Sequence, residues 1–482
     1  MTSAQDNPDG RSPYDIVVVG AGPVGENAAA RARQHGLSVC IVESRLLGGE
    51  CSYYACIPTK AMLRPLHARV AASRVRGVRG ATVDAAQVLA RRDGFTGLDP
   101  DTGGIDDSGQ AEWLDNEGID LIRGQGRLVG PRQVRVETTA GAIDLRARHA
   151  VVLATGSFPS VPPIDGLRDS DPWTNVDAST TAEVPDRLVV LGGGVVACEF
   201  GQAFAGLGST VTLLERGSRV LGRFEPFVSE QVTEGLRAAG VTVRTGTEVT
   251  GVLRRPDGTV AVTLSDDSVL EGDQVLVALG RRPSTVDVGV ESVGLEAGQY
   301  VEVDETLRAT GVPDGWLYAV GDVNGRNLLT HMGKYQARVA GDVIAARAAG
   351  RADDAPGMTA WADDTGTTQV VFTDPEVCSV GLTEEGARGR GLEVRVVEVP
   401  MSSAAGAALQ ADGYQGTARL VVDERRRVVV GATFVGQDTA ELLQSATVAV
   451  AGAVPLDRLW HAVPPFPTMS EVWLRLLEAY GL

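Results

Sequence analysis

The sequence predicts an α/β protein, because a chain pattern typical of that fold class occurs in it twice. In each copy a short apolar stretch runs into a glycine-rich turn, then an alanine-containing helical segment, and then a second apolar stretch. Strands that alternate with helices in this way build parallel sheets. The chain has 482 residues, of which 43% are hydrophobic, so it can bury more than one core. We therefore expect several domains, two of which contain a parallel sheet.

The first copy is YDIVVVGAGPVGENAAARARQHGLSVCIVE, residues 14–43, with Gly20, Gly22 and Gly25 in its turn. In a GxGxxG turn the first glycine permits a tight bend, and the second lets the backbone approach a pyrophosphate. The third glycine allows the helix to pack closely on the strand. Glu43 ends the second strand, where a carboxylate can accept hydrogen bonds from both hydroxyls of a ribose. Together these features predict a dinucleotide-binding unit of the Rossmann type.

The second copy is RLVVLGGGVVACEFGQAFAGLGSTVTLLE, residues 187–215. Its turn is of the GxGxxA form, with Gly192, Gly194 and Ala197, and we expect its second strand to end at Glu215. One chain therefore carries two predicted dinucleotide-binding units. Two dinucleotides on one polypeptide suggest transfer of hydride between them, and a flavin with a nicotinamide is the usual pair.

Composition excludes several other classes. The formal net charge of -18 argues against a nucleic-acid partner, which needs a basic surface. No apolar run approaches the 18 residues needed to span a bilayer, and the first thirteen residues are polar. Five cysteines do not make the disulfide framework of a secreted protein, and we expect Cys40, Cys198 and Cys378 to be core thiols. These features predict a cytoplasmic protein without membrane insertion.

The segment GGECSYYACIPTK, residues 48–60, holds the other two cysteines, Cys51 and Cys56. A zinc or iron–sulfur site at this pair lacks enough nearby ligands, so we expect no metal there. The polar and aromatic residues between the cysteines do not suit an inert core pair. Cysteines five apart in a regular helix lie too far apart for a disulfide, so a disulfide requires a distorted helix. Pro58, which lacks an N–H, would loosen that turn, and the spacing suits a reducible bridge better than a structural one.

The sequence resembles the class I pyridine nucleotide–disulfide oxidoreductases, a family that includes dihydrolipoamide dehydrogenase, glutathione reductase, mycothione reductase and mercuric reductase. The first matching motif is the cysteine segment Gly-Gly-x-Cys-x4-Cys-Ile-Pro-Thr-Lys after an N-terminal dinucleotide unit. Further matches are VVLATGSFPSVPPIDG with Thr155, Gly156 and Ser157; QVLVALGRRPST with Gly280; and WLYAVGDVNGRNLLTHMG with Asp322 and His331. VVFTDPEVCSVGLTEEGA and the strands that follow it resemble the family's dimer-interface domain.

The resemblance implies a role for each residue of the cysteine segment. Cys56 would lie nearer the flavin and form the thiolate that gives a charge-transfer band, and Cys51 would be the interchange thiol that meets the substrate. Lys60 would lie near the flavin, paired with Glu199. That pairing would explain one of the chain's only two lysines, Lys60 and Lys334, among 44 basic residues.

The resemblance also implies the domain order. An FAD-binding domain over residues 10–160 would be completed by residues 285–355. An NAD(P)-binding domain would occupy residues 161–284, and an α+β dimerisation domain residues 360–482. The family is dimeric, so the protein would be a homodimer with active sites shared between subunits.

The C-terminal segment departs from the family pattern. Family reductases carry a histidine before Pro-Thr that acts as acid and base for the interchange thiol, and a glutamate that orients it. Here the segment reads HAVPPFPTMSEVW, so that Phe466 takes the histidine's place while Glu471 stays in register. His461 lies too far from Glu471 to be the same residue without a shifted loop. Because general acid–base catalysis is worth roughly 10²–10⁴-fold, efficient turnover of lipoamide or glutathione disulfide is put in doubt.

These features predict an FAD-dependent NAD(P)H oxidoreductase that passes electrons through Cys51 and Cys56 to a small disulfide. Transfer from the flavin to a quinone, a dye or a metal ion is the alternative, because it needs no acid–base histidine. A redox-sensing flavoprotein without useful turnover is a third hypothesis. Glu215 favours NADH over NADPH, since a carboxylate repels a 2′-phosphate, whereas Arg216 and Arg223 favour NADPH. We expect NADH to be preferred.

Overall fold

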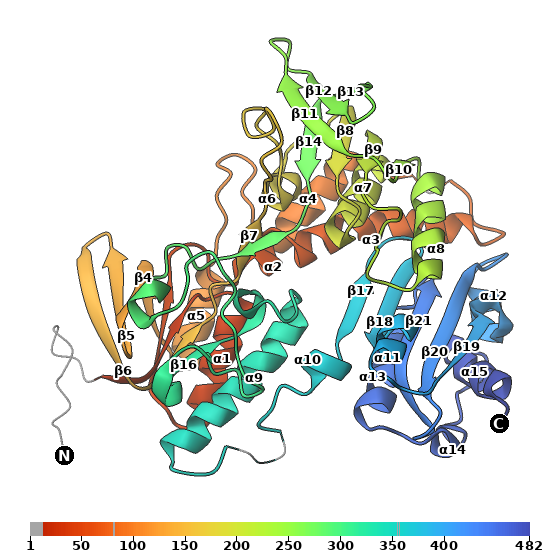
Figure 1. Ribbon diagram of the computed structural model, residues 1–482. Coiled ribbons are helices and arrows are strands. Elements are labelled where there is room, and N and C mark those ends of the chain that lie inside the picture. The colour runs from red at the N-terminus through yellow and green to blue at the C-terminus, as the bar shows by residue number, and fades with distance from the viewer. Residues whose placement is uncertain (1–12, 81, 354, 356) are drawn as a thin grey trace. The chain divides into compact units, whose positions relative to one another are not determined.

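The computed structural model describes residues 13–482 except residues 81, 354 and 356 (Figure 1). Its contacts divide the chain into two compact units. The first comprises the chain up to Cys56, Thr96–Phe158 and Arg281–Asp363. The second comprises Ile57–Phe95, Pro159–Gly280 and Asp364–Leu482. Each unit has hydrophobic cores of its own.

The first unit is built on a seven-stranded sheet of order β3-β2-β1-β6-β5-β4, with β16 paired to β6. Its strands are β1 (Tyr14–Val19), β2 (Val39–Glu43), β3 (Asp120–Arg123), β4 (Gln125–Gly130), β5 (Gln133–Thr138), β6 (Gly141–Leu153) and β16 (Leu317–Ala319). The last half of β6 is parallel to β1 and β16, and its first half is antiparallel to β5. The sheet therefore joins a parallel nucleotide-binding half to an antiparallel meander.

Helices α1 (Pro23–Gln34) and α9 (Thr330–Ala348) pack on each other and on one face of this sheet (Figure 1). Ile16 and Val18 of β1 point to these helices, whereas Val17 and Val19 point to the core on the other face. This alternation follows from the period of two in a strand, and both faces are apolar because both are buried. Short elements of the same unit include α2 (Gly49–Tyr53), α5 (Ser108–Asn116) and β15 (Arg281–Pro283).

The second unit contains the second parallel sheet, of order β10-β9-β8-β14. Its strands are β8 (Arg187–Leu191), β9 (Thr210–Leu214), β10 (Thr242–Arg244) and β14 (Gln274–Val277). An antiparallel meander of β11 (Val249–Arg254), β12 (Val260–Leu264) and β13 (Val269–Gly272) accompanies it. The helices α3 (Cys56–Ser73), α4 (Ala85–Thr96), α7 (Val195–Gly206) and α8 (Pro226–Ala238) contribute to its core. We expected this strand to end at Glu215. Strand β9 ends at Leu214, so Glu215 is the first residue after it.

The C-terminal part of the second unit is an antiparallel sheet of order β17-β18-β21-β20-β19. Its strands are β17 (Thr368–Val371), β18 (Glu376–Gly381), β19 (Val394–Pro400), β20 (Gly416–Asp423) and β21 (Val428–Gly436). Helices α13 (Leu443–Ala451) and α15 (Val472–Tyr480) share a core with it. The predicted α/β fold, with two dinucleotide-type sheets and a C-terminal α+β domain, is confirmed.

Candidate dinucleotide and dithiol site

The first glycine turn joins β1 to α1, and its backbone is packed too closely to admit side chains at two positions. Gly20 has a φ of +101°, and a Cβ on it would lie 2.5 Å from the carbonyl oxygen of Ala154. A Cβ on Gly25 would lie 1.9 Å from the carbonyl oxygen of Gly20. Gly22 has no atom nearer than 3.8 Å to that position and lines a cavity. The first and third glycines thus fix the turn, while the second leaves the backbone open at the start of a helix, where an anion binds well.

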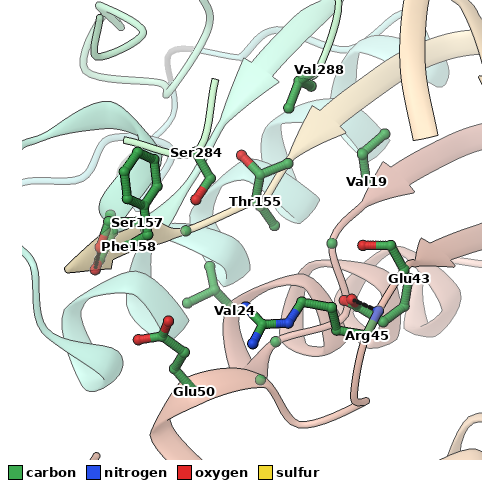
Figure 2. A pocket seen from close by; sticks show the side chains of 18 of the residues that line it. Val19, Val24, Glu43, Arg45, Glu50, Thr155, Ser157, Phe158, Ser284 and Val288 are labelled. Atoms are coloured by element: carbon green, nitrogen blue, oxygen red, sulfur yellow. Dashed lines mark hydrogen bonds between the residues drawn. The ribbon is translucent and has the colours of Figure 1, made fainter. Parts of the chain in front are cut away.

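The cavity at this turn has a volume of about 420 Å³. Figure 2 shows Glu43 and Arg45 on one side of it and Ser157 and Phe158 on the other. The Glu43 carboxylate accepts hydrogen bonds from the backbone N–H groups of Ala21 and Arg45, each at 2.7 Å. These two amides fix the carboxylate at the end of β2, where the sequence predicted a ribose-binding acid.

The opposite wall carries the segment Thr155, Gly156 and Ser157, which lines the cavity as a group. The hydroxyl of Ser157 donates to Asp322 Oδ2 at 2.5 Å, and Arg281 Nε donates to Ser157 Oγ at 2.6 Å. Burial raises the pKa of Asp322, with the Ser157 hydrogen bond acting against it. The Thr155 hydroxyl is buried at the cavity and finds no hydrogen-bond partner in the described part of the chain. A bound molecule that forms a hydrogen bond at this wall would give the Thr155 hydroxyl a partner.

His331 was also predicted to take part in cofactor binding. It lies on α9, is exposed, and is not among the residues that line the cavity, although its neighbour Thr330 is. Glu50 was missed by the sequence analysis. Its carboxylate lines the cavity and forms an ion pair with Arg281 at 2.5 Å. The motif around Gly280 contained Arg281, so the only sequence signal for this pair was an arginine directly after a predicted site residue.

The two cysteines stand where one helix ends and another begins. Helix α2 ends at Tyr53 and α3 begins at Cys56, which confirms the predicted distortion between them. Both cysteines are free thiols, the reduced form of the predicted pair. Cys51 lines the cavity, and Cys56 Sγ lies 3.8 Å from the hydroxyl oxygen of Thr330. The dithiol therefore lies at the wall of the dinucleotide cavity.

The two thiols differ in acidity. The hydrogen bond from Cys56, together with Thr330 and the charge of Lys334, lowers the pKa of Cys51 to about 6 against the effect of burial. The hydrogen bond to Cys51, burial and the charge of the Cys51 thiolate raise the pKa of Cys56. The two pKa values shift in opposite directions because each thiol is hydrogen-bonded to the other, and this hydrogen bond favours a single thiolate within the pair.

Lys60 lies one helical turn after Cys56 in α3, and Glu199 lies on α7. Both residues contact Phe372. The Lys60 ammonium lies 3.5 Å from the centre of the Phe372 ring, and Glu199 Oε1 accepts a hydrogen bond from the Phe372 backbone N–H at 2.8 Å. Burial lowers the pKa of Lys60, while the nearby carboxylates of Glu376 and Glu199 oppose that shift. The structure thus brings Lys60 and Glu199 to one place.

The second glycine turn joins β8 to α7. Gly192 has a φ of +113°, and a Cβ on it would lie 2.5 Å from the carbonyl oxygen of Ala278. Gly194 has open space at its Cβ position, and Ala197 is fully buried. Glu215 accepts the backbone N–H of Gly217 at 2.5 Å, and a Cβ on Gly193 would lie 2.8 Å from its Oε2. Three further residues belong to this region: Gly280 has a φ of +110°, and Arg216 and Arg223 are exposed.

The C-terminal segment exposes Phe466 and buries Glu471. The Phe466 side chain is 75% exposed, and His461 is exposed as well. Glu471 is 5% exposed; its Oε2 accepts the N–H of Ala405 at 3.1 Å, and its Oε1 pairs with Arg475 at 2.5 Å. Both carboxylate oxygens already have partners within the chain. The catalytic roles given to Phe466 and Glu471 stay predictions.

Among residues 13–482 without 81, 354 and 356, no group of three or more His, Cys, Asp or Glu side chains is arranged to hold a metal ion. No helix in this part of the chain is both long and apolar enough to cross a membrane.

Comparison with known sequences covers nearly the whole chain. Residues 14–347 match the family described as pyridine nucleotide-disulphide oxidoreductase, and residues 367–476 match its dimerisation domain. The chain is 34% identical over 481 residues to a dihydrolipoyl dehydrogenase of Thermus scotoductus, covering 97% of each chain. It is 30% identical over 484 residues to a mercuric reductase of Staphylococcus aureus, covering 95% of this chain and 81% of the relative.

Solved structures show the same fold. LpdA from Mycobacterium tuberculosis superimposes with a TM-score of 0.83 at 24% identity, covering 97% of this chain and 99% of the other. The HOCl-induced flavoprotein disulfide reductase RclA from Escherichia coli gives a TM-score of 0.81 at 24% identity, covering 96% and 99%. The chain therefore belongs to the class I pyridine nucleotide–disulfide oxidoreductase family and is a dimeric oxidoreductase that binds FAD and NAD(P).

Proposed function

We propose that the protein transfers hydride equivalents from NAD(P)H through FAD to a redox-active Cys51–Cys56 pair, which then reduces a small disulfide. One observation carries the proposal: Cys51 lines the dinucleotide cavity and hydrogen-bonds with Cys56. A thiol pair at a cavity wall can exchange electrons with a bound cofactor on one side and with a substrate on the other.

The cavity suits FAD. The open backbone at Gly22 and the start of α1 would hold the pyrophosphate, and Glu43 would hold a ribose. The unpartnered Thr155 hydroxyl and the Asp322 carboxylate offer further polar contacts on the opposite wall. FAD held there would supply the two-electron chemistry that links hydride from NAD(P)H to reduction of the disulfide form of the pair.

The residues of this chain would carry out the thiol steps. The Cys51 thiolate attacks one sulfur of the substrate disulfide, forms a mixed disulfide and releases one thiolate. Loss of the Cys51 charge removes a cause that raised the pKa of Cys56, so Cys56 can give its proton to that thiolate. The Cys56 thiolate then attacks Cys51, closes the intramolecular disulfide and releases the second substrate sulfur as a thiolate.

Two variants test the proposal. We expect the purified holoenzyme to oxidise NADH in the presence of at least one of a panel of small disulfides that includes lipoamide and glutathione disulfide. Cys51→Ser and Cys56→Ser should each abolish that activity and leave FAD bound, because neither replaces the cofactor contacts. Full disulfide reduction by Cys51→Ser would show that the pair is not on the electron path. Absence of any NAD(P)H-dependent bleaching of the flavin would favour a redox sensor.

A second candidate is reduction of a quinone, dye or metal ion directly at the flavin. The observation that favours it is Phe466, which is exposed and has no group that can transfer a proton. A relative of 30% identity is a mercuric reductase, and a structural neighbour has been described as a Cu(II) complex of RclA. Quinone or metal-ion reduction that survives Cys51→Ser, without any disulfide reduction in the wild type, would support this candidate.

The remaining assignments follow from the same proposal. Lys60 and Glu199 would lie beside the flavin, and Gly192, Gly194, Ala197, Glu215 and Gly280 would bind the nicotinamide dinucleotide. The domain limits of 10–160, 161–284, 285–355 and 360–482 are proposed with them. In the dimer, Phe466 and Glu471 would face the partner subunit's Cys51. We propose NADH as the preferred donor; a kcat/KM for NADPH about tenfold higher than for NADH would reverse this choice.

A further inference from the structure

Asp322, which the proposed function gives to FAD as a polar contact, lies in a short helical turn, η3 (Gly321–Asn324), that follows β16. Val320, Gly321 and Asp322 all line the cavity. Gly321 has a φ of +76°, and a Cβ on it would lie 3.1 Å from the side chain of Val24 in α1. The chain therefore presents Asp322 to the cavity from a closely packed turn in the left-handed conformation.

A single side chain of α9 holds both ends of this turn. Gln336 is fully buried, and its Oε1 accepts the backbone N–H of Gly321 at 2.7 Å and Asn324 Nδ2 at 2.8 Å. Asn324 Nδ2 also donates to the carbonyl oxygen of Ala319, the last residue of β16, at 3.1 Å. One side-chain oxygen thus holds the first and the last residue of η3.

The amide nitrogen of Gln336 is held in turn by Asp363, on α10 (Ala362–Thr365). Gln336 Nε2 donates to Asp363 Oδ1 at 3.1 Å and to Oδ2 at 3.0 Å. The Asp363 side chain is 5% exposed, and its oxygens also accept from Arg326 Nη1 at 3.4 Å and from Asn327 Nδ2 at 3.3 Å. Burial raises the pKa of Asp363, and these three side chains oppose that shift. All three are donors, which suits a carboxylate, since it can only accept.

These bonds fix the orientation of the Gln336 amide. The Asp363 carboxylate takes the amide nitrogen, so the amide oxygen is turned toward Gly321 and Asn324. A reversed amide would set its NH2 group against two donors of the turn and its oxygen against the carboxylate. In a buried site such mismatches leave polar groups unpaired, which is costly. Asp363 therefore acts on the Asp322 turn through Gln336, and all of these residues belong to the first compact unit, which ends at Asp363.

We propose that Asp363 and Gln336 form a polar relay that fixes the η3 turn for FAD: Asp363 orients the Gln336 amide, and the amide oxygen holds the turn that presents Asp322 to the cofactor. Both are positioning residues, because neither lines the cavity. The inference rests on the proposed function, in which Asp322 contacts FAD. Both residues lie outside the motif WLYAVGDVNGRNLLTHMG, so the local pattern around Asp322 does not indicate them.

The dissociation constant of FAD, measured from the fluorescence of FAD released when the purified holoenzyme is diluted, tests the relay. Gln336→Met keeps a side chain of similar length but removes its acceptor and its donors, so it should raise this constant about tenfold or more. Gln336→Met with the FAD dissociation constant of the wild type would overturn the proposal.

Gln202→Met is the matched control. Gln202 is a 5% exposed glutamine of the second unit that accepts the N–H of Asp374 at 2.7 Å and donates to its carbonyl oxygen at 2.9 Å. Its replacement should lower the melting temperature to an extent similar to Gln336→Met but leave FAD dissociation within about twofold of the wild type. An equal loss of FAD from both variants would indicate general loosening of the fold and would also overturn the relay.

Exchanging the polarity of the two side chains separates the relay from a loss of packing. Gln336→Glu sets two carboxylates against each other, and Asp363→Asn sets an amide against an amide among donors, so each variant alone should bind FAD less tightly at pH 8. The double variant Gln336→Glu, Asp363→Asn again pairs a donor with an acceptor and leaves an oxygen for the Gly321 N–H. It should bind FAD more tightly than either single variant, and a double variant that binds no more tightly than they do would refute the relay.

Asp322→Ala distinguishes a failure of this inference from a failure of the proposed function. If Asp322→Ala keeps the wild-type dissociation constant, the proposed placement of FAD against Asp322 fails. If Asp322→Ala weakens FAD binding while Gln336→Met does not, that placement stands and the relay alone is wrong. Weaker binding in both, together with rescue in the double variant, is the result that we expect.

Discussion

The two glycine turns of this protein share one sequence pattern but differ at their third position, which is Gly25 in the first and Ala197 in the second. A methyl group at Gly25 would lie 1.9 Å from the Gly20 carbonyl oxygen, whereas the Ala197 methyl is accommodated and fully buried. Helix α1 is thus packed more tightly against the end of its strand than α7 is. The first turn also lies in a cavity walled by polar side chains from distant parts of the chain. The difference accords with the proposal that FAD occupies the cavity at the first turn.

The largest expected effect comes from filling the tighter turn. Gly25→Ala should lose FAD and lower the melting temperature markedly, because the overlap is with backbone and cannot be relieved by turning a side chain. Overpacking of this kind costs about 1–3 kcal/mol or more. The measurement is the ratio of FAD to protein after gel filtration, together with thermal unfolding.

The reverse change at the looser turn is the control. Ala197→Gly should retain FAD and cost no more than about 1 kcal/mol, the usual penalty of glycine in a helix. FAD retention by Gly25→Ala equal to that of Ala197→Gly would show that the two turns are equivalent.

Much of this comparison could be predicted from the sequence. Both turns, both acids and the cysteine segment are short-range patterns, because backbone geometry at a glycine or a helix end depends on near neighbours. The break between α2 and α3 was predicted in the same way, from Pro58 and the spacing of the two cysteines.

Contacts between distant segments could not be predicted. Cys56 Sγ lies 3.8 Å from the hydroxyl oxygen of Thr330 although 274 positions separate the two residues in the chain, and nothing local to either residue signals the meeting. The rarity of lysine singled out Lys334 but gave no location for it. Likewise one oxygen of Glu471 accepts the N–H of Ala405, 66 positions away in the chain, which no local pattern signals; its other oxygen pairs with Arg475, only four residues on.

The next largest effect should distinguish Glu43 from Glu215, the acids that follow the second strand of each glycine-turn segment. Glu43→Gln should weaken FAD retention and leave the KM for NADH unchanged once FAD is supplied in excess. Glu215→Gln should keep FAD but raise the KM for NADH by about tenfold, the scale of one charged hydrogen bond. Steady-state kinetics and FAD content measure both. A common effect of the two variants on FAD content alone would contradict the assignment of one dinucleotide to each unit.

A pH profile should separate the dinucleotide steps from the thiol step. The pKa of Cys51 is lowered to about 6, so the reactive thiolate is present above that pH and is lost as the pH falls through it. Disulfide reduction should therefore rise about tenfold from pH 5 to pH 7 and then level off. Reduction of the flavin by NADH, followed by stopped flow, should lack this step because Cys51 takes no part in it. A profile that instead rises through pH 8 or 9 would show that Cys51 has the acidity of an ordinary thiol.

The smallest expected effect is at the C-terminal segment, which differs from both turns in being exposed. Phe466→His restores an imidazole where related reductases carry one, but Glu471 is buried and already bonded to Ala405 and Arg475. The new ring would lack a fixed orientation, so we expect a severalfold rise in disulfide reduction, well short of the roughly 10²–10⁴-fold value of full acid–base catalysis. Quinone reduction should stay constant, since it needs no proton at this position. Arg475→Met frees one oxygen of Glu471, so the double variant Phe466→His, Arg475→Met should reduce disulfides faster than Phe466→His alone. Equal rates in the single and the double variant would mean that Glu471 does not orient the ring.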